Sequence, residues 1–403
     1  MQVFFSVGEP SGDLHGANLI SELRKRAPLV AWGLGGPKMQ NAGCELMRDM
    51  SDLAVMGLFP VLAKLPTFWR LRDQVEQSLD EHRPDAVVLI DYPGFNWHVA
   101  RMAKERGIPV FYYGLPQLWA WATWRVKKVQ RYVDHALCKL PFEENWFRQQ
   151  SCNATYVGHP YFDELRQQQI DQQFVRQVRP QAVQLLTILP GSRDQEVKCN
   201  LPDLLAAAAK VKQQNPRVRL AIASYNDRQA TAARELITRA RVEADIFVGR
   251  TPELIAAADC CLACSGSVSL ELLYHAKPAV IVYRVNWLTY QCVLRLVNVR
   301  YVTLVNLLAS SRPLISDTAG RPQAENPDEV LYPEYPTWRD CSNEIAAHAQ
   351  GWLNDEPSRQ RLIERLKTLR ERVAAGGASA RAADYIVRSL AGLQNPAANQ
   401  RAA

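Results

Sequence analysis

The chain has 403 residues, of which 47% are hydrophobic and 22% charged, and its formal net charge is +7. This composition excludes a disordered or fibrous protein and is typical of a soluble globular enzyme, and the length favours two domains. No apolar run reaches the roughly 18 residues of a membrane span, and the amino terminus lacks the pattern of a signal peptide. Nine irregularly spaced cysteines predict reduced thiols and a cytoplasmic protein.

Short β-rich segments alternate with amphipathic segments along the chain, which predicts parallel sheets with helices on both faces. We therefore expect an α/β protein with two Rossmann-like, doubly wound domains that face each other across a cleft. The expected N-terminal domain spans 1–170, the C-terminal domain spans 171–355, and a helical tail at 356–403 packs back on the N-terminal domain. The strand segments of the first half are VFFSV, VAWGLGG, DAVVLIDYP, PVFYYGLP, HALCKLP and ATYVGHP, and those of the second are QLLTILPG, VRLAIAS, ADIFVG, DCCLACSGS and PAVIVYRV.

A polar, glycine-rich loop, GEPSGDLHGANL, begins at Gly8, directly after the first apolar segment. In doubly wound sheets ligands bind beyond the carboxyl ends of the strands, and amides at a helix N-terminus favour anions or sugar hydroxyls. The alternative is a plain turn and helix cap, for which the same residue types are also used. The predicted sugar contacts are Glu9, Ser11, Gly12, Asp13 and His15.

A second candidate loop, LPGSR, follows the first strand segment of the second half. Gly191 lets the backbone approach a ligand closely, Ser192 can cap a helix or bind phosphate, and Arg193 offers a fixed cationic fork for a diphosphate. Taken alone, this loop is equally compatible with an ordinary connection between a strand and a helix.

A third candidate, SGSVSLE, consists of small residues at a strand end followed by a helix. Ser265, Gly266 and Ser267 leave room for phosphate, and Glu271 is predicted to accept hydrogen bonds from ribose hydroxyls. The alternative for Glu271 is a first-turn charge that the helix dipole stabilises. The preceding cysteines, at 260, 261 and 264, are interpreted as buried thiols of a strand, because no second pair lies at zinc spacing.

The order of these motifs resembles the lipid-A-disaccharide synthase family, whose members are inverting glycosyltransferases of the GT-B architecture. The motifs that carry the resemblance are GEPSGD at 8–13, GLGGPKMQNAGCE at 33–45, LAVMGLFPVL at 53–62, IDYPGFN at 90–96, WAW at 119–121, PFE at 141–143, VGHP at 157–160, LPGSR at 189–193, SGS…LE at 265–271 and NLLA at 306–309.

The resemblance implies a specific reaction of lipid A and hence lipopolysaccharide biosynthesis. The donor is UDP-2,3-diacylglucosamine, the acceptor is 2,3-diacylglucosamine 1-phosphate (lipid X), and the products are a β-1,6-linked tetraacyl disaccharide 1-phosphate and UDP. The C-terminal domain binds the donor, with Asn306 among the contacts, and the N-terminal domain binds the acceptor. The resemblance also implies no metal or other cofactor, a peripheral location on the cytoplasmic face of the inner membrane, no nucleic acid and a possible homodimer.

A single inverting displacement needs a base for the acceptor hydroxyl and stabilisation of the departing diphosphate. Asp91 ends the segment AVVLI just before a Tyr-Pro-Gly turn, so its carboxylate is expected at the ligand-binding edge of the sheet. The alternative is an Asp that only caps the turn. The resemblance assigns base catalysis to Asp91, an acceptor contact to Asn96 and leaving-group stabilisation to Arg193.

Two departures limit what the resemblance transfers. Gly94 stands where the family commonly has a second acidic residue, so no role passes to that position. The passage after Asn306 is longer and richer in proline than is usual, Pro333-Glu334 is interpreted as a remnant of the family's Pro-Glu, and no contacts are assigned there. His159, at a strand end, is interpreted as at most a site-lining residue.

The segment 53–75 mixes large apolar residues with Lys64, Arg70 and Arg72. Aromatic and aliphatic side chains beside cations suit a membrane interface, although a core helix with a basic outer face would show the same pattern. The tryptophans of WAWATWRVKK leave the same two readings open. The predicted acyl-chain and membrane contacts are Met56, Leu58, Phe59, Leu62, Phe68 and Trp69.

Two other classes of function remain open from the residues. One is a different UDP-sugar enzyme on the same scaffold, such as a UDP-N-acetylglucosamine 2-epimerase or a peptidoglycan glycosyltransferase. The other is a non-catalytic peripheral membrane protein that binds a nucleotide sugar. The apolar and basic segment at 53–75 argues against a fully soluble substrate.

Overall fold

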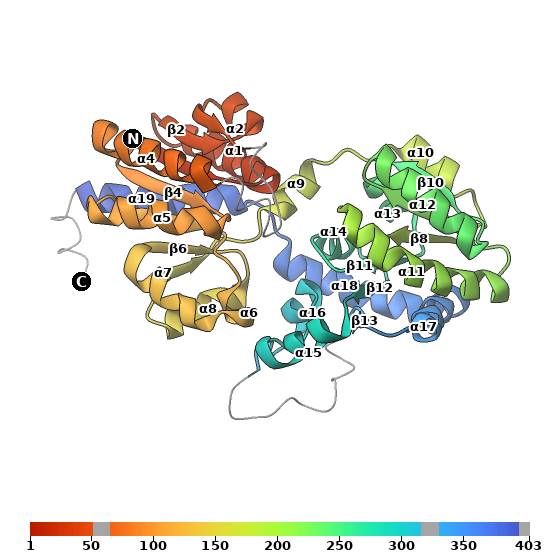
Figure 1. The fold of residues 1–403 in the computed structure, drawn as a ribbon. Helices are drawn as coiled ribbons and strands as arrows, with labels where there is room; N and C mark the ends of the chain where they lie inside the picture. The colour runs from red at the N-terminus through yellow and green to blue at the C-terminus, as the bar shows by residue number, and fades with distance from the viewer. Residues whose placement is uncertain (51–64, 316–329, 395–403) are drawn as a thin grey trace. The chain divides into compact units, whose positions relative to one another are not determined.

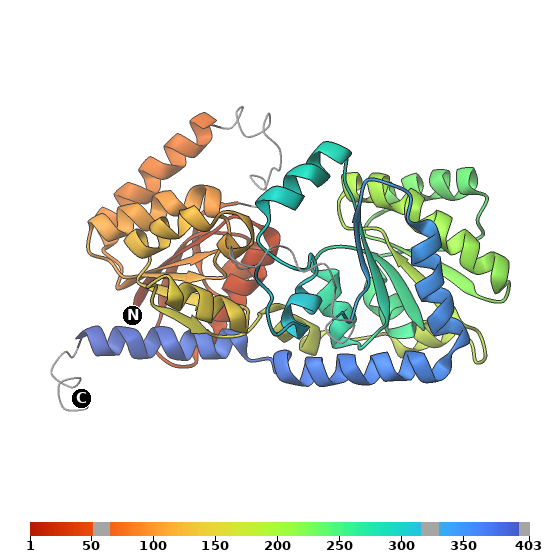
Figure 2. The same ribbon diagram turned by 90° about the horizontal axis from the view of Figure 1, so that it is seen from below.

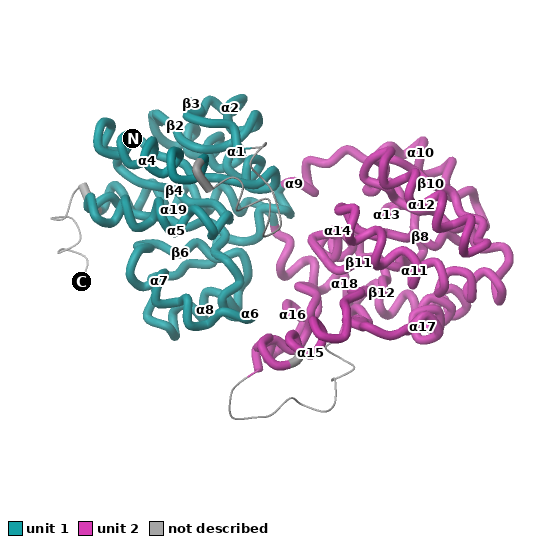
Figure 3. The backbone as a smooth tube through the Cα atoms, viewed as in Figure 1, with its two compact units in different colours: residues 1–163, 376–403 teal, residues 164–375 magenta. Residues whose placement is uncertain are grey.

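The computed structural model describes residues 1–50, 65–315 and 330–394. The chain divides into two compact units (Figure 3): unit 1 comprises residues 1–163 and 376–403, and unit 2 comprises residues 164–375. Each unit contains one parallel sheet, so the α/β class with two doubly wound sheets is confirmed.

Unit 1 is built on a seven-stranded sheet in the order β3-β2-β1-β4-β5-β6-β7. All neighbouring strands are parallel, and β1 lies between β2 and β4, with Val3 opposite both Ala31 and Ala86. Nearly all residues of β1, β4 and β5 are buried, which is expected of a sheet covered on both faces. The strands are β1 (Gln2–Val7), β2 (Val30–Gly35), β3 (Glu45–Asp49), β4 (Ala86–Ile90), β5 (Val110–Tyr113), β6 (His135–Cys138) and β7 (Ala154–Tyr156).

Alternate residues of the strands of unit 1 face two separate apolar cores. One core joins Phe5 to Leu19 of α1 and Ile386 of α19, and the other joins Phe4 to Val75 of α4. The helices of this unit are α1 (Pro10–Arg24), α2 (Pro37–Asn41), α4 (Leu65–His82), α5 (Pro93–Glu105), α6 (Leu118–Trp121), α7 (Val126–Tyr132), α8 (Pro141–Gln149) and α19 (Ala378–Gln394), and α9 (Tyr161–Gln167) begins at the end of unit 1.

The carboxyl-terminal helices belong to different units. Helix α19 packs on α1, where Arg26 Nε donates to Asp384 Oδ1 at 2.6 Å. Helix α18 (Glu356–Val373), by contrast, packs on α14, α16 and α17 of unit 2 through Leu362, Leu366 and Leu369. The expected tail at 356–403 is therefore two elements, and only the second belongs with the N-terminal unit. The observed divisions after 163 and 375 differ from the expected ones after 170 and 355.

Unit 2 repeats the same architecture with six parallel strands in the order β10-β9-β8-β11-β12-β13 (Figure 1). The strands are β8 (Leu185–Leu189), β9 (Arg219–Ser224), β10 (Asp245–Val248), β11 (Cys260–Cys264), β12 (Ala279–Arg284) and β13 (Glu334–Thr337). Its other helices are α10 (Gln172–Val178), α11 (Asp194–Gln214), α12 (Asp227–Ala240), α13 (Thr251–Ala257), α14 (Val268–Tyr274), α15 (Trp287–Leu296), α16 (Leu304–Ala309) and α17 (Ser342–Asn354).

The strand order places the candidate loops at the reversal point of each sheet. On either side of β1 and of β8 the chain winds in opposite directions, so the loops after β1 and β4, and after β8 and β11, diverge at the carboxyl edge. These loops contain Gly8 and Asp91 in unit 1, and Ser192 and Gly266 in unit 2. Among the described residues, no helix combines the length and apolar character needed to cross a bilayer.

A half-buried histidine predicts a pH-dependent loss of stability. Burial, assisted by the charges of Lys277 and Arg370, lowers the pKa of His275 to about 4. Below about pH 6.5 His275 therefore binds a proton in the unfolded chain but stays neutral in the folded chain, and the unfolding free energy falls as the pH drops toward 4. When the pH is lowered from about 7.5 to 4.5, the unfolding free energy of the wild type should fall by roughly 2 kcal/mol more than that of His275→Gln, measured by urea denaturation. An equal loss in both proteins would contradict this.

Candidate functional site

The turn after β4 holds Asp91 in a strained backbone conformation. Asp91 and Tyr92 both have φ of +45°, a region that non-glycine residues rarely occupy. Such strain persists only where surrounding contacts hold it. Here Tyr112 Oη donates to the Asp91 carbonyl at 2.7 Å, and Asn96 Nδ2 donates to the same oxygen at 2.8 Å. The Asp91 carboxylate is thus directed by a fixed turn at the carboxyl edge of the sheet.

Asn96 holds this turn from below and does not face the edge. It is fully buried, its Oδ1 accepts from Ser6 Oγ at 2.6 Å, and its Nδ2 also donates to the Ser6 carbonyl at 3.2 Å. Because both ends of the amide are engaged inside unit 1, the predicted acceptor contact is corrected to a positioning role. Asn96 ties the carbonyls at the ends of β1 and β4 together.

Lys139, which the sequence analysis did not single out, is the partner of Asp91. It follows β6, and its Nζ lies 3.0 Å from Asp91 Oδ1. Burial opposes the charge of the ammonium group, but Asp91 and Glu143 more than offset this and raise the pKa of Lys139. The lysine therefore stays charged and fixes one carboxylate oxygen of Asp91.

Glu143 of the PFE motif supports Lys139 through its backbone. Its Oε2 accepts from the amides of Lys139 and Leu140 at 2.9 and 3.0 Å, and its Oε1 accepts from Trp119 Nε1 at 3.0 Å. Burial raises the pKa of Glu143, although Lys139 and these donors oppose the rise. The PFE and WAW motifs are thus explained as parts of the support behind Asp91.

The opening loop lies directly against the Asp91 turn. A Cβ on Gly8 would stand 2.2 Å from the Tyr92 ring, so only glycine permits this approach. Burial, with the nearby Glu9 carboxylate, raises the pKa of Tyr92 to about 12. Glu9 and Ser11 are exposed at this edge, whereas Gly12 is buried against Val7.

Asp13 has a structural role within unit 1. Its carboxylate accepts from the amides of Gly36, Lys38 and Met39, each at 3.0 Å, and so caps helix α2. The predicted sugar contact of Asp13 is corrected accordingly. His15 is buried near His159, whose pKa is lowered well below its usual value by burial and by the charges of Lys139 and His15.

The LPGSR loop of unit 2 is organised by Glu196, on the first turn of α11. Glu196 Oε2 accepts from the amides of Ser192 and Arg193 at 2.9 and 3.1 Å, and Oε1 lies 3.0 Å from Arg193 Nη1. Gly191 has φ of +123°, and a Cβ there would stand 2.6 Å from Glu196. The amides expected to face an anion are occupied by an internal carboxylate, while the Arg193 side chain is exposed at the edge.

The loop after β11 presents Gly266 and Ser267 at the same edge, and both are exposed. Apart from its two chain neighbours, no atom of the described residues lies within 4 Å of a Cβ built on Gly266, so the space beside it is open. Glu271 follows on α14 and is only 5% exposed. Ser265, half-buried, donates its amide to the Val282 carbonyl at 3.1 Å. The cysteines at 260, 261 and 264 are buried in β11.

Asn306, predicted to contact the donor, is a clamp inside unit 2. It is fully buried, its Nδ2 donates to the Tyr332 carbonyl at 2.7 Å, and its Oδ1 accepts from the amides of Leu331 and Tyr332 at 3.0 Å. Nδ2 also lies 3.2 Å from Glu334 Oε2. The prediction is corrected, because the whole amide group is used to attach α16 to the strand β13.

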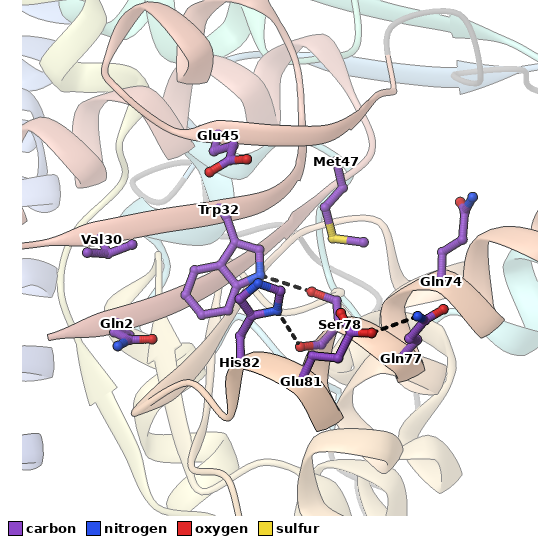
Figure 4. A pocket seen from close by; sticks show the side chains of 10 residues that line it. All are labelled: Gln2, Val30, Trp32, Glu45, Met47, Gln74, Gln77, Ser78, Glu81 and His82. Carbon is purple, nitrogen blue, oxygen red and sulfur yellow. Dashed lines mark hydrogen bonds between the residues drawn. The ribbon is translucent and has the colours of Figure 1, made fainter.

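One cavity of about 540 Å³ adjoins the LPGSR loop and is lined by Glu196, Cys199, Tyr283, Arg284 and Trp338, among others. A second, of about 390 Å³, lies between α4 and the strands β2 and β3 (Figure 4). Its lining includes Gln2 and Val30, the first residues of β1 and β2, so it opens toward the amino ends of the strands. That position is remote from the edge where doubly wound sheets bind ligands.

The predicted membrane residues are only partly described. Met56, Leu58, Phe59 and Leu62 lie outside the described residues. Phe68 is half-buried against Phe95, with ring centroids 6.2 Å apart, whereas Trp69 is exposed and lies 4.9 Å from the Arg72 guanidinium.

Comparison with known proteins assigns the chain to a family. Residues 3–326 match the family model described as lipid-A-disaccharide synthetase. The chain is 34% identical over 390 residues to a lipid-A-disaccharide synthase of Anaeromyxobacter dehalogenans, covering 96% of this chain and 97% of that protein. It is 38% identical over 307 residues to that of Idiomarina loihiensis, covering 75% and 81%. The chain belongs to the lipid-A-disaccharide synthase family.

Solved structures agree with this at the level of the fold. A UDP-GlcNAc 2-epimerase of Neisseria meningitidis bound to UDP-GlcNAc aligns with a TM-score of 0.62 at 12% identity, covering 97% of this chain and 99% of that one. The calicheamicin glycosyltransferase CalG4 aligns with a TM-score of 0.54 at 15% identity, covering 97% and 98%. The synthase therefore has a GT-B-like fold, as expected.

The corrected role of Asn306 in this synthase is testable. Asn306→Ala leaves the amides of Leu331 and Tyr332 without their buried acceptor, which costs about 2–4 kcal/mol of unfolding free energy. We expect the folded variant to bind UDP as the wild type does, measured by calorimetry. Asn41→Ala, at an exposed position of α2, is the matched control and should change stability by less than about 0.5 kcal/mol. If Asn306→Ala instead has wild-type stability but no longer binds UDP, the original prediction that Asn306 contacts the donor is correct.

Proposed function

We propose that this lipid-A-disaccharide synthase condenses UDP-2,3-diacylglucosamine with 2,3-diacylglucosamine 1-phosphate in one inverting displacement. The family membership supports the reaction, and the observation that carries the mechanism is the carboxylate of Asp91, held on a strained turn beside a charged lysine. In this proposal unit 1 binds the acceptor and unit 2 binds the donor.

Asp91 is the proposed general base. Lys139 engages Oδ1, so Oδ2 is the oxygen assigned to the acceptor's 6-hydroxyl. As the hydroxyl oxygen attacks C1 of the donor sugar, its proton passes to Asp91, and the bond from C1 to the diphosphate oxygen breaks with its electron pair leaving on UDP. Lys139 positions the carboxylate and keeps it from rotating away from the hydroxyl.

We propose that the Arg193 guanidinium stabilises the negative charge of the departing diphosphate. Glu196 orients its guanidinium from Nη1, which leaves the other donors of the fork for phosphate oxygens. Gly191 and Ser192 complete this loop, and Ser265, Gly266 and Ser267 line the nucleotide side of the same edge. We assign the ribose contact to Glu271. Because this side chain is buried, the ribose would reach it through the loop formed by Ser265, Gly266 and Ser267.

The acceptor sugar is assigned to the exposed part of the opening loop. Glu9 and Ser11 offer hydrogen-bonding groups beside the Asp91 turn, with Gly12 and His15 at their base. We propose no sugar contact for Asp13 or Asn96, because backbone groups already engage their polar atoms.

Because both substrates carry acyl chains, we propose that the enzyme works peripherally on the cytoplasmic face of the inner membrane. Trp69 beside Arg72, and Trp121 with Arg125 at 5.3 Å, place exposed aromatic rings next to cations on unit 1, as interfacial segments do. The segment 53–64 is assigned to the acyl chains on its sequence alone.

One incubation separates this function from its alternatives. Radiolabelled donor with lipid X should give a lipid-linked disaccharide and free UDP, and neither should form without the acceptor. A 2-epimerase would instead alter the donor sugar in the absence of acceptor, and a non-catalytic binder would leave it unchanged. Either result would overturn the proposal.

The role of Asp91 predicts the effect of one substitution. Asp91→Asn preserves shape but cannot accept the hydroxyl proton, and general base catalysis typically contributes roughly 100- to 10,000-fold in rate. We expect kcat to fall at least 100-fold, with unchanged thermal stability and UDP affinity. Asp80→Asn, at an exposed carboxylate of the same unit, should keep wild-type kcat. If Asp91→Asn unfolds the protein, Asp91 is a structural cap, and retained activity would mean that another group takes the proton.

The role of Arg193 makes a different prediction. Arg193→Ala removes charge from the departing diphosphate, which costs about 3 kcal/mol in the transition state, or roughly 100-fold in kcat/KM. Arg239→Ala, which removes an exposed arginine from the last turn of α12, is the control and should behave as wild type. The measurement is kcat/KM for the donor at saturating acceptor, and a near-normal value would contradict a role of Arg193 in the site.

A further inference from the structure

Helix α15 of unit 2 presents apolar side chains outward. Asn286 caps it by accepting from the Thr289 amide at 2.7 Å, and the chain enters it directly from β12. Leu288 and Leu296 are 67% and 64% exposed, and Trp287 is 55% exposed. Residues 288, 292 and 296 recur every four positions and so share one face of the helix. In an ordinary surface helix this stripe would face the core.

Two further aromatic side chains extend this surface. Tyr283, at the end of β12, and Trp338, directly after β13, are 41% and 44% exposed. Both line the same cavity as Thr289 of α15, so they lie beside the first turn of the helix. We call the α15 face the surface formed by Tyr283, Trp287, Leu288, Cys292, Leu296 and Trp338. Exposed apolar side chains that gather on one part of a protein surface are typical of an interaction site.

The chain segment that contains α15 carries positive side chains only, although Glu196 lines the cavity beside Tyr283 and Trp338. The sequence from Leu272 to Ile315 contains Lys277, Arg284, Arg295, Arg300 and Arg312 but no Asp or Glu. Lys277 is bound to backbone carbonyls, and Arg284 is paired with Asp203 at 2.9 Å. Arg295 and Arg312 are exposed, and Arg295 follows Cys292 by three residues on α15 itself. An exposed apolar stripe edged by cations complements an anionic bilayer, where tryptophan and arginine lie at headgroup depth.

We infer that the α15 face is a lipid-binding surface through which unit 2 contacts an anionic membrane. The inference rests on the proposed function, in which unit 2 holds a donor that carries two acyl chains. It adds that unit 2 contacts lipid by its own helix, separately from the aromatic and basic side chains of unit 1. Figures 1 and 2 show α15 at the periphery of unit 2, and the exposed fractions of Trp287, Leu288 and Leu296 show that these side chains reach its surface.

Co-sedimentation with sucrose-loaded vesicles tests this surface. The triple variant Trp287→Ser, Leu288→Ser, Leu296→Ser should lose at least about tenfold in partitioning to phosphatidylglycerol vesicles, because binding scales with inserted apolar area. Arg295→Glu, a single surface change, should lose about fivefold or more on phosphatidylglycerol and little on phosphatidylcholine. Val30→Ser and Arg361→Glu are matched controls at exposed positions outside this face and should partition as the wild type does.

Turnover in detergent micelles separates this inference from the proposed function. The variants should form disaccharide in micelles at the wild-type rate, since neither the Asp91 turn nor the Arg193 loop is altered. Wild-type partitioning by the triple variant and by Arg295→Glu would overturn the α15 face as a lipid surface. A changed oligomeric state in sedimentation velocity, with vesicle binding intact, would also overturn it and assign the face to a second copy. Failure of the wild type to form disaccharide would overturn only the function.

Discussion

The candidate site of unit 1 depends on a turn that the chain would not adopt by itself. Two consecutive non-glycine residues, Asp91 and Tyr92, have left-handed backbone angles, which costs free energy. The hydrogen bonds from Tyr112 and Asn96 to the Asp91 carbonyl hold that turn. Because β5, β1 and α5 supply these contacts and their buried neighbours, the packing of the unit fixes the position of one carboxylate.

The support extends outward from the Asp91 carboxylate, and each successive partner lies farther from the reacting hydroxyl. Lys139 contacts the carboxylate itself, Glu143 holds the backbone of Lys139, and Trp119 holds Glu143. Each partner is a charged or polar group that would be costly to bury alone and is satisfied by the next. This arrangement explains why aromatic residues of WAW and an acid of PFE occur together in a chain whose proposed base lies elsewhere in the sequence.

Unit 2 holds its charged candidate residue, Arg193, by a different arrangement. Its LPGSR loop is organised by a single acid, Glu196, which binds two backbone amides and the Arg193 guanidinium. The cost of the loop is a glycine at position 191, where any side chain would collide with that acid. Both units therefore keep a preorganised charge at the reversal point of a parallel sheet, a carboxylate in one and a guanidinium in the other.

The sequence by itself determined the alternation of strands and helices, the two doubly wound sheets and the family, because periodicity and ordered motifs are local properties. It also placed Asp91 and Arg193 at strand ends. It missed the edge strands β3 and β13, whose residues are largely polar or only partly buried. Only the tertiary structure decided that the side chains of Asn96, Asp13 and Asn306 point inward and that the apolar stripe of α15 faces outward. It also decided that Lys139 contacts Asp91, 48 positions away in the sequence, and that α19 belongs to unit 1. The direction of a side chain depends on which elements pack around it, and that packing is set by contacts between distant parts of the chain.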